Sequence, residues 1–445
     1  MKIFLLGLSK TFIFITAYYI FCEMKNHDFS NLSEMKFDVS KNQKLFLQKI
    51  DGICKLLREE EEKSYLKASL NKKVIPFFNK IGMLGCPISK EYGGLGYDIL
   101  SYLLALERIG EEGSSMRTFF SCHTSIGQMI LQNWGTEEQK KKFLPNTTKG
   151  IDIMAFALTE PNAGSDPSLI ETTFEESGEH FIISGKKHWV GNGTFAKTIT
   201  TYAKEKGSDK KISAFIIDLS SPSIKKKEIK NKVGLLTVKN AIIEFNNYKT
   251  SKENLLGLSG NGLSIAFSAL IDGRLSVAAG AIGVMRDCLK ETIRFSKNRT
   301  QHGTVLAKKQ LVQQHISQII VALESTKWLV YKAATIRQQL QIYLETLKRE
   351  NDRWIFTINR KNKKYSNFRN ECDRLSAIAK YYATNACVDV TNRSVQIFGA
   401  EGYKKTSRVA RHFLDSRATT IYEGANEVLE LKIATEILGN EYRAY

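Results

Sequence analysis

The chain has 445 residues, 42% hydrophobic and 10% aromatic with only 6 prolines, which excludes a disordered or collagen-like chain and fits two or three folded domains. Its formal net charge of +19 would suit an anionic partner such as nucleic acid or a membrane surface, but no RGG, zinc-finger or RNA-recognition signature accompanies the dispersed lysines. We therefore interpret the charge as a lysine-rich surface and expect no nucleic-acid partner.

Residues 1–22, "MKIFLLGLSKTFIFITAYYIFC", are apolar but are interrupted by Ser9 and Lys10. A secretory signal ends in a small-residue cleavage site, which "AYYIFC" does not provide, and a membrane span needs about 20 residues with few charges. We favour an over-extended start before Met35 and expect a cytoplasmic, bacterial protein. Membrane attachment or organelle targeting through this segment stays open.

Three segments follow, and they differ in the period of their apolar residues. Residues 35–152 predict a helical domain, because stretches such as "DILSYLLALERIGEE" place apolar residues at i, i+3, i+4 and i+7. Residues 153–257 carry short alternating runs such as "KISAFIIDL", which predict antiparallel strands. Residues 258–445 return to helical patterns, with a charged helical hairpin or insertion near 340–375. The order indicates an α+β chain.

Cysteines and histidines give no sign of a metal or disulfide framework. The 7 cysteines form no C-x-x-C pair, and the 7 histidines form no H-E-x-x-H motif. An odd, scattered set of cysteines is typical of a reducing compartment. We therefore expect free thiols and no catalytic metal.

Four short stretches carry the candidate chemistry. The loop "FALTEPNAGSD" (156–166) combines backbone N–H groups and small hydroxyls, which suit a flat heterocycle or a phosphate. In "HWVGNGTFA" (188–196) a large aromatic stands beside small residues, as stacking on a ring system requires. The stretch "QIFGAEGY" (396–403) contains two glycines that allow close backbone approach. In "IYEGANE" (421–427) Glu423 stands between a tyrosine and a glycine and precedes a helix, where it is either a helix-end carboxylate or a general base.

This ordered set of motifs resembles the acyl-CoA dehydrogenase family of flavoproteins over about residues 36–440. The resemblance implies two helical domains flanking a middle antiparallel β-barrel, with the subunits assembled as a homotetramer. It also implies FAD as cofactor, acyl-CoA thioesters as substrates and an electron-transfer flavoprotein as the electron acceptor.

By position, the resemblance also assigns site residues. Those matched to FAD contacts are Phe156, Ala157, Leu158, Thr159, Trp189, Val190, Gly191, Gln396, Gly399, Ala400, Ala425 and Glu427, with Arg299 and Gln310 matched to contacts across a subunit interface. Those matched to substrate contacts are Ser165, Arg274, Tyr422 and Gly424.

Glu423 falls on the family's usual catalytic base, which would remove the proton alpha to the thioester while the flavin takes the beta hydrogen as hydride. A free glutamate has a pKa of roughly 4.3, and burial beside Tyr422 should raise it toward the pH of the reaction. Some members carry the base one residue before the arginine matched by Arg274, but this chain has Gly273 there. We therefore predict Glu423 as the base.

The departures of the chain from the family pattern include two at residues expected near the cofactor. Gly191 stands where most relatives have Ser or Thr, and His302 stands where Phe is usual. The first departure keeps open an acyl-CoA oxidase, which passes electrons to oxygen. Two further possibilities are a DNA-binding member of the family, supported only by the net charge, and a catalytically idle relative. We favour the dehydrogenase because Glu423 and the flavin motifs are present.

Overall fold

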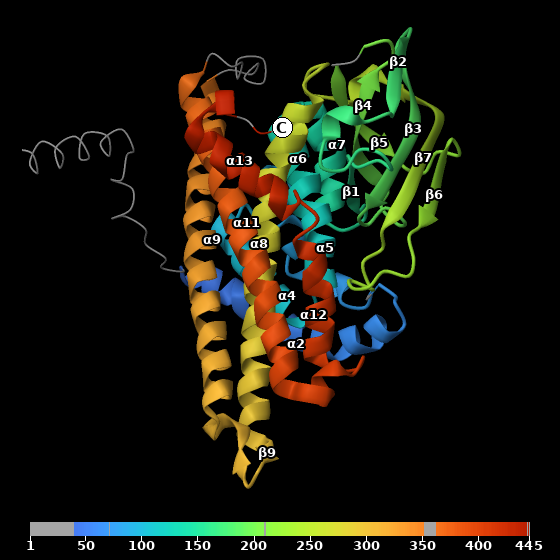
Figure 1. Ribbon diagram of the computed structural model, residues 1–445. Coiled ribbons are helices and arrows are strands. Elements are labelled where there is room, and N and C mark those ends of the chain that lie inside the picture. Colours follow the sequence, from blue (N-terminus) through green and yellow to red (C-terminus); the bar gives the residue numbers. More distant parts are fainter. Residues whose placement is uncertain (1–39, 71, 209–210, 351–361, 443, 445) are drawn as a thin grey trace, which may run out of the picture. The chain divides into compact units, whose positions relative to one another are not determined.

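The computed structural model describes residues 40–442 and 444, except 71, 209–210 and 351–361. Residues 41–445 form one compact unit, which is described here by itself (Figure 1). The apolar residues 1–22 and the centre of the 340–375 segment lie outside the described residues. The predictions made for them, including the cytoplasmic location, stay predictions.

The first part of the unit is helical, as its periodicity predicts. Asp98 caps the helix that follows it by accepting a hydrogen bond from the Ser101 N–H, and Thr136 and Gln139 form a capping box before the last helix. The elements are α2 (Lys41–Leu66), α3 (Ile75–Lys80), η2 (Met83–Gly85), η3 (Lys90–Tyr92), α4 (Ile99–Glu112), α5 (Ser114–Phe120), the π-helical turn η4 (Ser121–Gln128), α6 (Met129–Trp134) and α7 (Glu137–Thr148).

The middle part is one sheet of eight strands, in the order β6-β7-β3-β2-β4-β5-β8 with β1 added on β4. Its core is aromatic, since Phe174, Phe181 and Phe215 meet edge to face. The strands are β1 (Met154–Ala157), β2 (Thr173–Ser177), β3 (His180–Val190), β4 (Thr198–Glu205), β5 (Ile212–Asp218), β6 (Ile224–Glu228), β7 (Ala241–Ser251) and β8 (Leu255–Leu256).

The strand directions partly correct the prediction of an antiparallel domain. Most neighbouring pairs are antiparallel, but β1 and β2 both run parallel to β4. The reason is that β3 lies between β2 and β4 in sequence and turns the chain back, so β4 again points the way of β2. The end strands β6 and β8 are not paired with each other in the described part of the chain. Closure into a barrel therefore stays a prediction.

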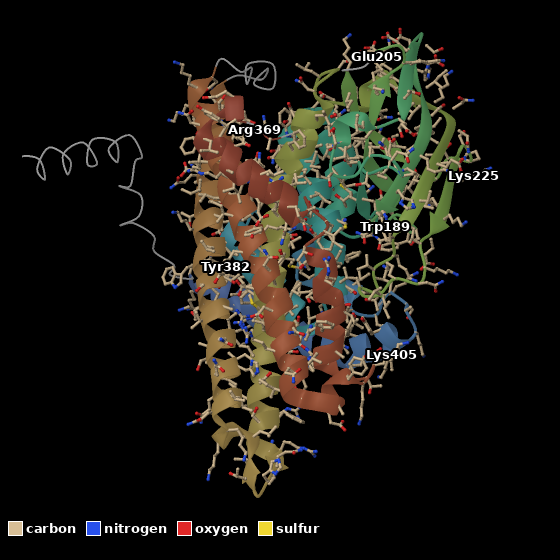
Figure 2. The ribbon with its side chains drawn as sticks, in the orientation of Figure 1. Trp189, Glu205, Lys225, Arg369, Tyr382 and Lys405 are labelled. Atoms are coloured by element: carbon tan, nitrogen blue, oxygen red, sulfur yellow. The ribbon has the colours of Figure 1, made fainter. Side chains whose placement is uncertain are left out.

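The edge strand β6 carries part of the lysine-rich surface. Lys225, Lys226 and Lys227 are exposed along it, and Lys225 points away from the sheet (Figure 2). Charged side chains on an edge strand discourage pairing with another sheet. A local structural reason therefore accounts for these charges.

Long helices form the last part of the unit. They are α8 (Gly262–Asn298), α9 (Gln310–Glu350), α11 (Lys363–Phe398), α12 (Arg408–Thr419) and α13 (Asn426–Leu438), with the small pair β9 (Thr300–Gln301) and β10 (Thr304–Val305) between α8 and α9. By length and composition α8 could cross a membrane, but 83% of its apolar window is buried inside the protein. This burial is typical of a core helix, and Figure 1 shows α8 partly behind α11.

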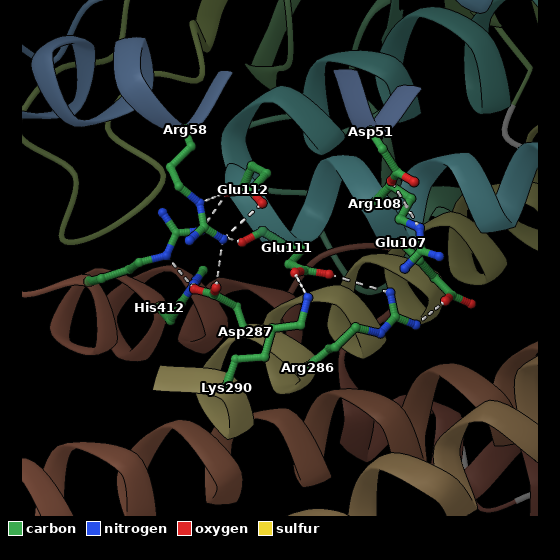
Figure 3. A network of polar contacts seen from close by, with 11 residues as sticks. Asp51, Arg58, Glu107, Arg108, Glu111, Glu112, Arg286, Asp287, Lys290 and His412 are labelled. Carbon is green, nitrogen blue, oxygen red and sulfur yellow. Dashed lines mark hydrogen bonds and ion pairs between the residues drawn. The ribbon is translucent and has the colours of Figure 1, made fainter. Parts of the chain in front are cut away.

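An ionic network ties α12 to α2, α4 and α8 (Figure 3). At its centre Asp287 of α8 accepts hydrogen bonds from Arg58 at 3.0 Å and from His412 at 2.7 Å, and it also pairs with Arg408. Arg58 and Arg408 both pair with Glu112 of α4. The network fixes the helix that leads into the Glu423 loop.

Candidate active site

Glu423 lies in the short loop between α12 and α13, in an unusual backbone conformation. Its φ is 57°, and Gly424 follows with a φ of 92°. A left-handed glutamate is strained and persists only where neighbouring groups hold it. Two cations do so, since Arg274 Nε donates to the Glu423 carbonyl at 3.3 Å and Lys380 Nζ donates to the Gly424 carbonyl at 2.7 Å.

The Glu423 carboxyl group points at α8, where a glycine leaves room for it. A Cβ atom at Gly273 would lie 2.3 Å from Oε2, so any other residue there would displace the carboxylate. Oε2 is buried and has no hydrogen-bond partner in the described part of the chain. Burial raises the pKa of Glu423 to about 7, against the opposing pull of Arg274, Arg117 and Lys380.

Lys380 of α11 is fully buried beside the same loop. Its Nζ also donates to Asn426 Oδ1 at 2.8 Å, and Asn426 donates in turn to Thr384 at 3.0 Å. Burial lowers the pKa of Lys380 to about 7, while Glu423 raises it. Glu423 and Lys380 therefore each favour the charged form of the other.

Arg117 of α5 also reaches the loop. Its Nη2 donates to the Tyr422 hydroxyl at 2.7 Å. The side chain is only 2% exposed, yet Nε and Nη1 have no acceptor among the described residues. Together with Arg274 and Lys380 it surrounds Glu423 with positive charge from α5, α8 and α11.

The predicted flavin-lining motifs meet at one edge of the sheet. The His188 N–H donates to the Thr159 carbonyl at 2.8 Å, which joins "FALTE" to the tryptophan motif. A break in register between Lys187 and Val190 accompanies a φ of 57° at Trp189. The indole is 52% exposed, whereas Val190 is buried (Figure 2). Ala157 and Leu158 are buried, and Phe156 and Thr159 are half-buried beside them.

A buried ion pair supports this edge. Lys187 Nζ lies 2.6 Å from Glu160 Oε1, and both side chains are buried. Glu160 also accepts hydrogen bonds from the Glu171 N–H at 2.5 Å and the Thr172 N–H at 3.1 Å. Burial opposes its charge, but Lys187 and these donors prevail and lower the pKa of Glu160. Sequence reasoning missed this pair, although a lysine among the buried positions of a strand was a usable signal.

Gly191 packs against a thiol from the π-helical turn. A Cβ atom at this position would lie 2.4 Å from Cys122 Sγ, so the sulfur fills the space of a side chain at 191. Burial and the nearby Glu423 raise the pKa of Cys122 to about 12, which keeps the thiol protonated. A π-helical turn is frequent at functional sites. Nothing in the sequence alone connected Cys122 with Gly191.

The remaining predicted site residues make no side-chain hydrogen bond or ion pair with Glu423 or Lys380 within the described part of the chain, although the charge of Glu427 raises the pKa of Lys380. Ser165 is exposed in the loop after β1, and Glu427 is exposed on α13, whose N-cap is Ala425. The others lie near the ends of α8 and α11, which Phe295 and Phe398 join by stacking at 4.1 Å. These residues, all exposed, are Arg299, Gln310, Gln396, Gly399 and Ala400.

Comparison with models of known protein families identifies the family of this chain. The N-terminal, middle and C-terminal domain models of acyl-CoA dehydrogenase match residues 41–151, residues 155–248, and residues 260–346 with 358–438, respectively. The chain belongs to the acyl-CoA dehydrogenase family. It is therefore an acyl-CoA dehydrogenase, an oxidoreductase and a flavoprotein, as the resemblance of its motifs predicted.

Individual relatives resemble almost the whole chain. The short-chain specific acyl-CoA dehydrogenase of Clostridium acetobutylicum is 33% identical over 91% of this chain and 100% of its own. A caffeyl-CoA reductase-Etf complex subunit of Acetobacterium woodii is 32% identical over 87% of this chain and 97% of its own. The structure of butyryl-CoA dehydrogenase from Megasphaera elsdenii superposes with a TM-score of 0.81 at 30% identity, over 91% of this chain and all of that one.

FAD is the cofactor of the family, and the residues of the acyl-CoA dehydrogenase described here fit it. The exposed Trp189 indole offers an apolar surface on which a ring system can stack. The Thr159 hydroxyl, half-buried beside it, makes no hydrogen bond within the described residues and can donate to a polar ring edge. Trp189, Thr159 and the strand β1 would therefore hold the flavin.

Proposed function

We propose that this acyl-CoA dehydrogenase oxidises the α,β-bond of an acyl-CoA thioester, with Glu423 as the base that removes the alpha proton. The observation that carries the proposal is the Glu423 carboxyl itself. It is half-buried, its Oε2 is without a partner among the described residues, and its pKa is raised to about 7. A general base works best when its pKa lies near the operating pH.

The backbone of the same residue supplies a second function. The Glu423 N–H makes no hydrogen bond to another described residue, so it can donate to the thioester carbonyl. Such a donor stabilises the negative charge that develops on that oxygen as the alpha proton leaves. The left-handed backbone fixes the N–H and the carboxylate of one residue in the same loop. FAD, when bound, supplies the acceptor for the hydride from the beta carbon.

Positive charge around Glu423 favours the deprotonated base. Arg274 is fixed by Asp373 at 2.5 Å as well as by the Glu423 carbonyl, so its position is set independently of the substrate. Lys380 is fixed by Gly424 and Asn426. Without these cations, burial would raise the pKa of the carboxyl still further. Tyr422, whose hydroxyl accepts a hydrogen bond from Arg117, lies next to the proposed base in the chain.

We also propose an electron-transfer flavoprotein as acceptor and a homotetramer as the assembly. The relative named as a subunit of an Etf complex supports the acceptor. The exposed positions of Arg299 and Gln310 support an interface between subunits, as do the exposed apolar side chains Leu311 and Val321 of α9. Oxygen consumption without an added acceptor would indicate an oxidase instead, and sedimentation velocity would test the tetramer.

The experiment that tests the activity is anaerobic titration of the purified protein with acyl-CoAs of graded length, followed by flavin absorbance. We expect bleaching by at least one class, with a rate about 10²–10⁴-fold lower in Glu423→Gln. Lys140→Met is the control for substitution of a buried residue, since Lys140 pairs with Glu137 on α7 and does not face Glu423. Bound flavin that no acyl-CoA bleaches would overturn the proposal.

A further inference from the structure

Arg117 is a buried cation that makes no ion pair with a described carboxylate, and Glu423 acts on it only through a longer-range charge interaction. By residue volume it is the largest of the fully buried side chains that the structure describes. The structure gives it no ion pair with a described carboxylate, and its one hydrogen bond, from Nη2, goes to the neutral Tyr422 hydroxyl. By contrast, the buried Arg337 contacts Asp272 at 2.8 and 3.0 Å, and Arg274 contacts Asp373 at 2.5 Å.

An unpaired guanidinium in the interior is costly, because water no longer solvates its charge. Two of its nitrogens, Nε and Nη1, have no acceptor in the described part of the chain. Arginine forms its strongest contacts with planar anions such as carboxylates. A buried, unpaired arginine beside a catalytic carboxyl is therefore suited to an anionic part of the substrate.

Helix α8 relates Arg117 to the base. A Cβ atom at Gly273 would touch the Glu423 carboxylate, and a Cβ atom at Gly280 would lie 2.6 Å from Arg117 Nε. The two glycines are separated by two helical turns, so they lie on the same side of α8 about 10 Å apart along its axis. Glu423 and Arg117 thus face one side of one helix, at the places where it lacks side chains.

This separation fits a short acyl chain. A reacting alpha carbon lies about 3–3.5 Å from its base, and a carboxylate oxygen lies about 2.7–2.9 Å from a guanidinium nitrogen. When the separation of the two glycines is taken as the separation of the groups that cover them, about 4 Å remains between the alpha carbon and the far end of the chain, which is the reach of roughly three carbon–carbon bonds. An acyl group of about five carbons with a terminal carboxylate would span the two residues.

We propose that Arg117 binds a carboxylate at the far end of the acyl chain, so that the preferred substrate is the CoA thioester of a short dicarboxylic acid. The inference rests on the proposed function, since it places the acyl group between Glu423 and Arg117. The oxidation itself is unchanged: the alpha proton goes to Glu423, and the hydride from the beta carbon, with its electron pair, goes to FAD. The terminal carboxylate takes no part in bond making.

The test compares two acyl groups of equal length. Glutaryl-CoA and pentanoyl-CoA differ only in the terminal carboxylate, and Glu423→Gln protein with bound FAD allows their binding to be measured by calorimetry without turnover. We expect glutaryl-CoA to bind at least about 10-fold more tightly, because a charge-assisted pair replaces an unpaired buried cation. In Glu423→Gln/Arg117→Met the order should reverse, and in Glu423→Gln/Arg117→Lys part of the preference should remain.

Tyr422→Phe, also in the Glu423→Gln background, separates anion binding from a merely structural role. It removes the hydroxyl that Arg117 contacts but keeps the cation, so the preference for glutaryl-CoA should persist. Equal binding of the two thioesters, tighter binding of pentanoyl-CoA, or a preference that survives Arg117→Met would overturn the proposal. Bound FAD per chain checks that the variants fold, and Arg117→Lys decides the matter if Arg117→Met does not fold. A wild-type flavin that neither thioester nor any other acyl-CoA bleaches would overturn the proposed function instead.

Discussion

Two buried clusters of charge in this protein are built in opposite ways. In the ionic network of Figure 3, Asp287 contacts Arg58, Arg408 and His412 at once, and Glu112 contacts the same two arginines. Burial opposes the charge on Asp287, but His412 and Arg408 prevail and hold its pKa well below the usual range. Around Glu423, the acid has no ion-pair partner within the described chain, and its pKa is raised to about 7.

The difference separates charges that stabilise the fold from charges that the proposed reaction would use. A carboxylate with several fixed donors stays ionised, and its substitution strongly destabilises the fold. A carboxyl with an unpartnered oxygen and a raised pKa can exchange a proton near neutral pH. Both clusters contact the same segment, since α12 carries Arg408 and His412 and leads into Glu423. The rigid network can therefore support the strained loop.

The largest effect should come from removing the central acid of the network. Asp287→Asn would leave Arg58, Arg408 and His412 facing a neutral amide, so we expect a loss of about 3–5 kcal/mol in the free energy of unfolding. Urea unfolding followed by circular dichroism measures it. A loss below about 1 kcal/mol would mean that the network does not differ from an ordinary surface pair.

The matched variant in the other cluster is Glu423→Gln, which should not destabilise the protein. Because the folded pKa of Glu423, about 7, exceeds its ordinary 4.5, the folded state loses stability as pH rises through this window. Glu423→Gln removes that loss, so its stability relative to wild type should increase between pH 5 and pH 8. The urea midpoint at the two pH values checks the sign.

Gly273→Ala should lower the rate of catalysis although it removes no charged group. The new Cβ would lie 2.3 Å from Glu423 Oε2 and must push the carboxylate away. A displacement of about 1 Å at a reacting group can cost about 100-fold in rate. Gly52→Ala in α2 is the control, because no atom lies within 4 Å of its added Cβ. Unchanged flavin bleaching in Gly273→Ala would place the working carboxylate elsewhere.

The contact between Gly191 and Cys122 predicts a pair of compensating substitutions. Gly191→Ser would place its Cβ 2.4 Å from Cys122 Sγ, so it should destabilise the protein by about 1–3 kcal/mol through overpacking. Gly191→Ser combined with Cys122→Ala should recover most of that loss, whereas Cys122→Ala alone should have a smaller effect. Thermal unfolding of all three variants measures the coupling. Additive effects would contradict the assignment of the thiol to that space.

The smallest expected effect concerns the pH dependence of the reaction. Lys380→Met removes one of the three cations that lower the Glu423 pKa, so the acid limb of the bleaching rate should move up by about 0.5–1 pH unit. Arg274 and Arg117 face Glu423 from α8 and α5 and stay in place. Lys380→Arg keeps the charge and should keep the midpoint even if its rate falls. An equal loss of rate at every pH in Lys380→Met would mean a purely structural role.

Much of the architecture could be predicted from local pattern. The periods of apolar residues predicted α2, α4, β5 and β7, because a helix or strand repeats its buried positions over a few residues. The four motifs also identified Glu423 and placed it just before a helix, where α13 indeed begins at Asn426. The parallel pairing of β1 and β2 with β4 was missed, because the relative direction of two paired strands depends on the path of the chain between them.

The sequence by itself thus determined the order of the elements, and it supplied the predicted flavin-lining motifs and the position of the proposed base, since each depends on residues close together in the chain. Only the tertiary structure decided what surrounds that base. Arg117 lies 306 residues before Glu423 in the chain and Lys380 lies 43 before it, yet both act on its pKa. The need for glycine at positions 273 and 191 became clear only from the Glu423 carboxylate and the Cys122 thiol, which occupy the space of a side chain there. The burial of a side chain and the charges around it depend on the residues that pack against it, and folding brings those residues together from distant parts of the chain.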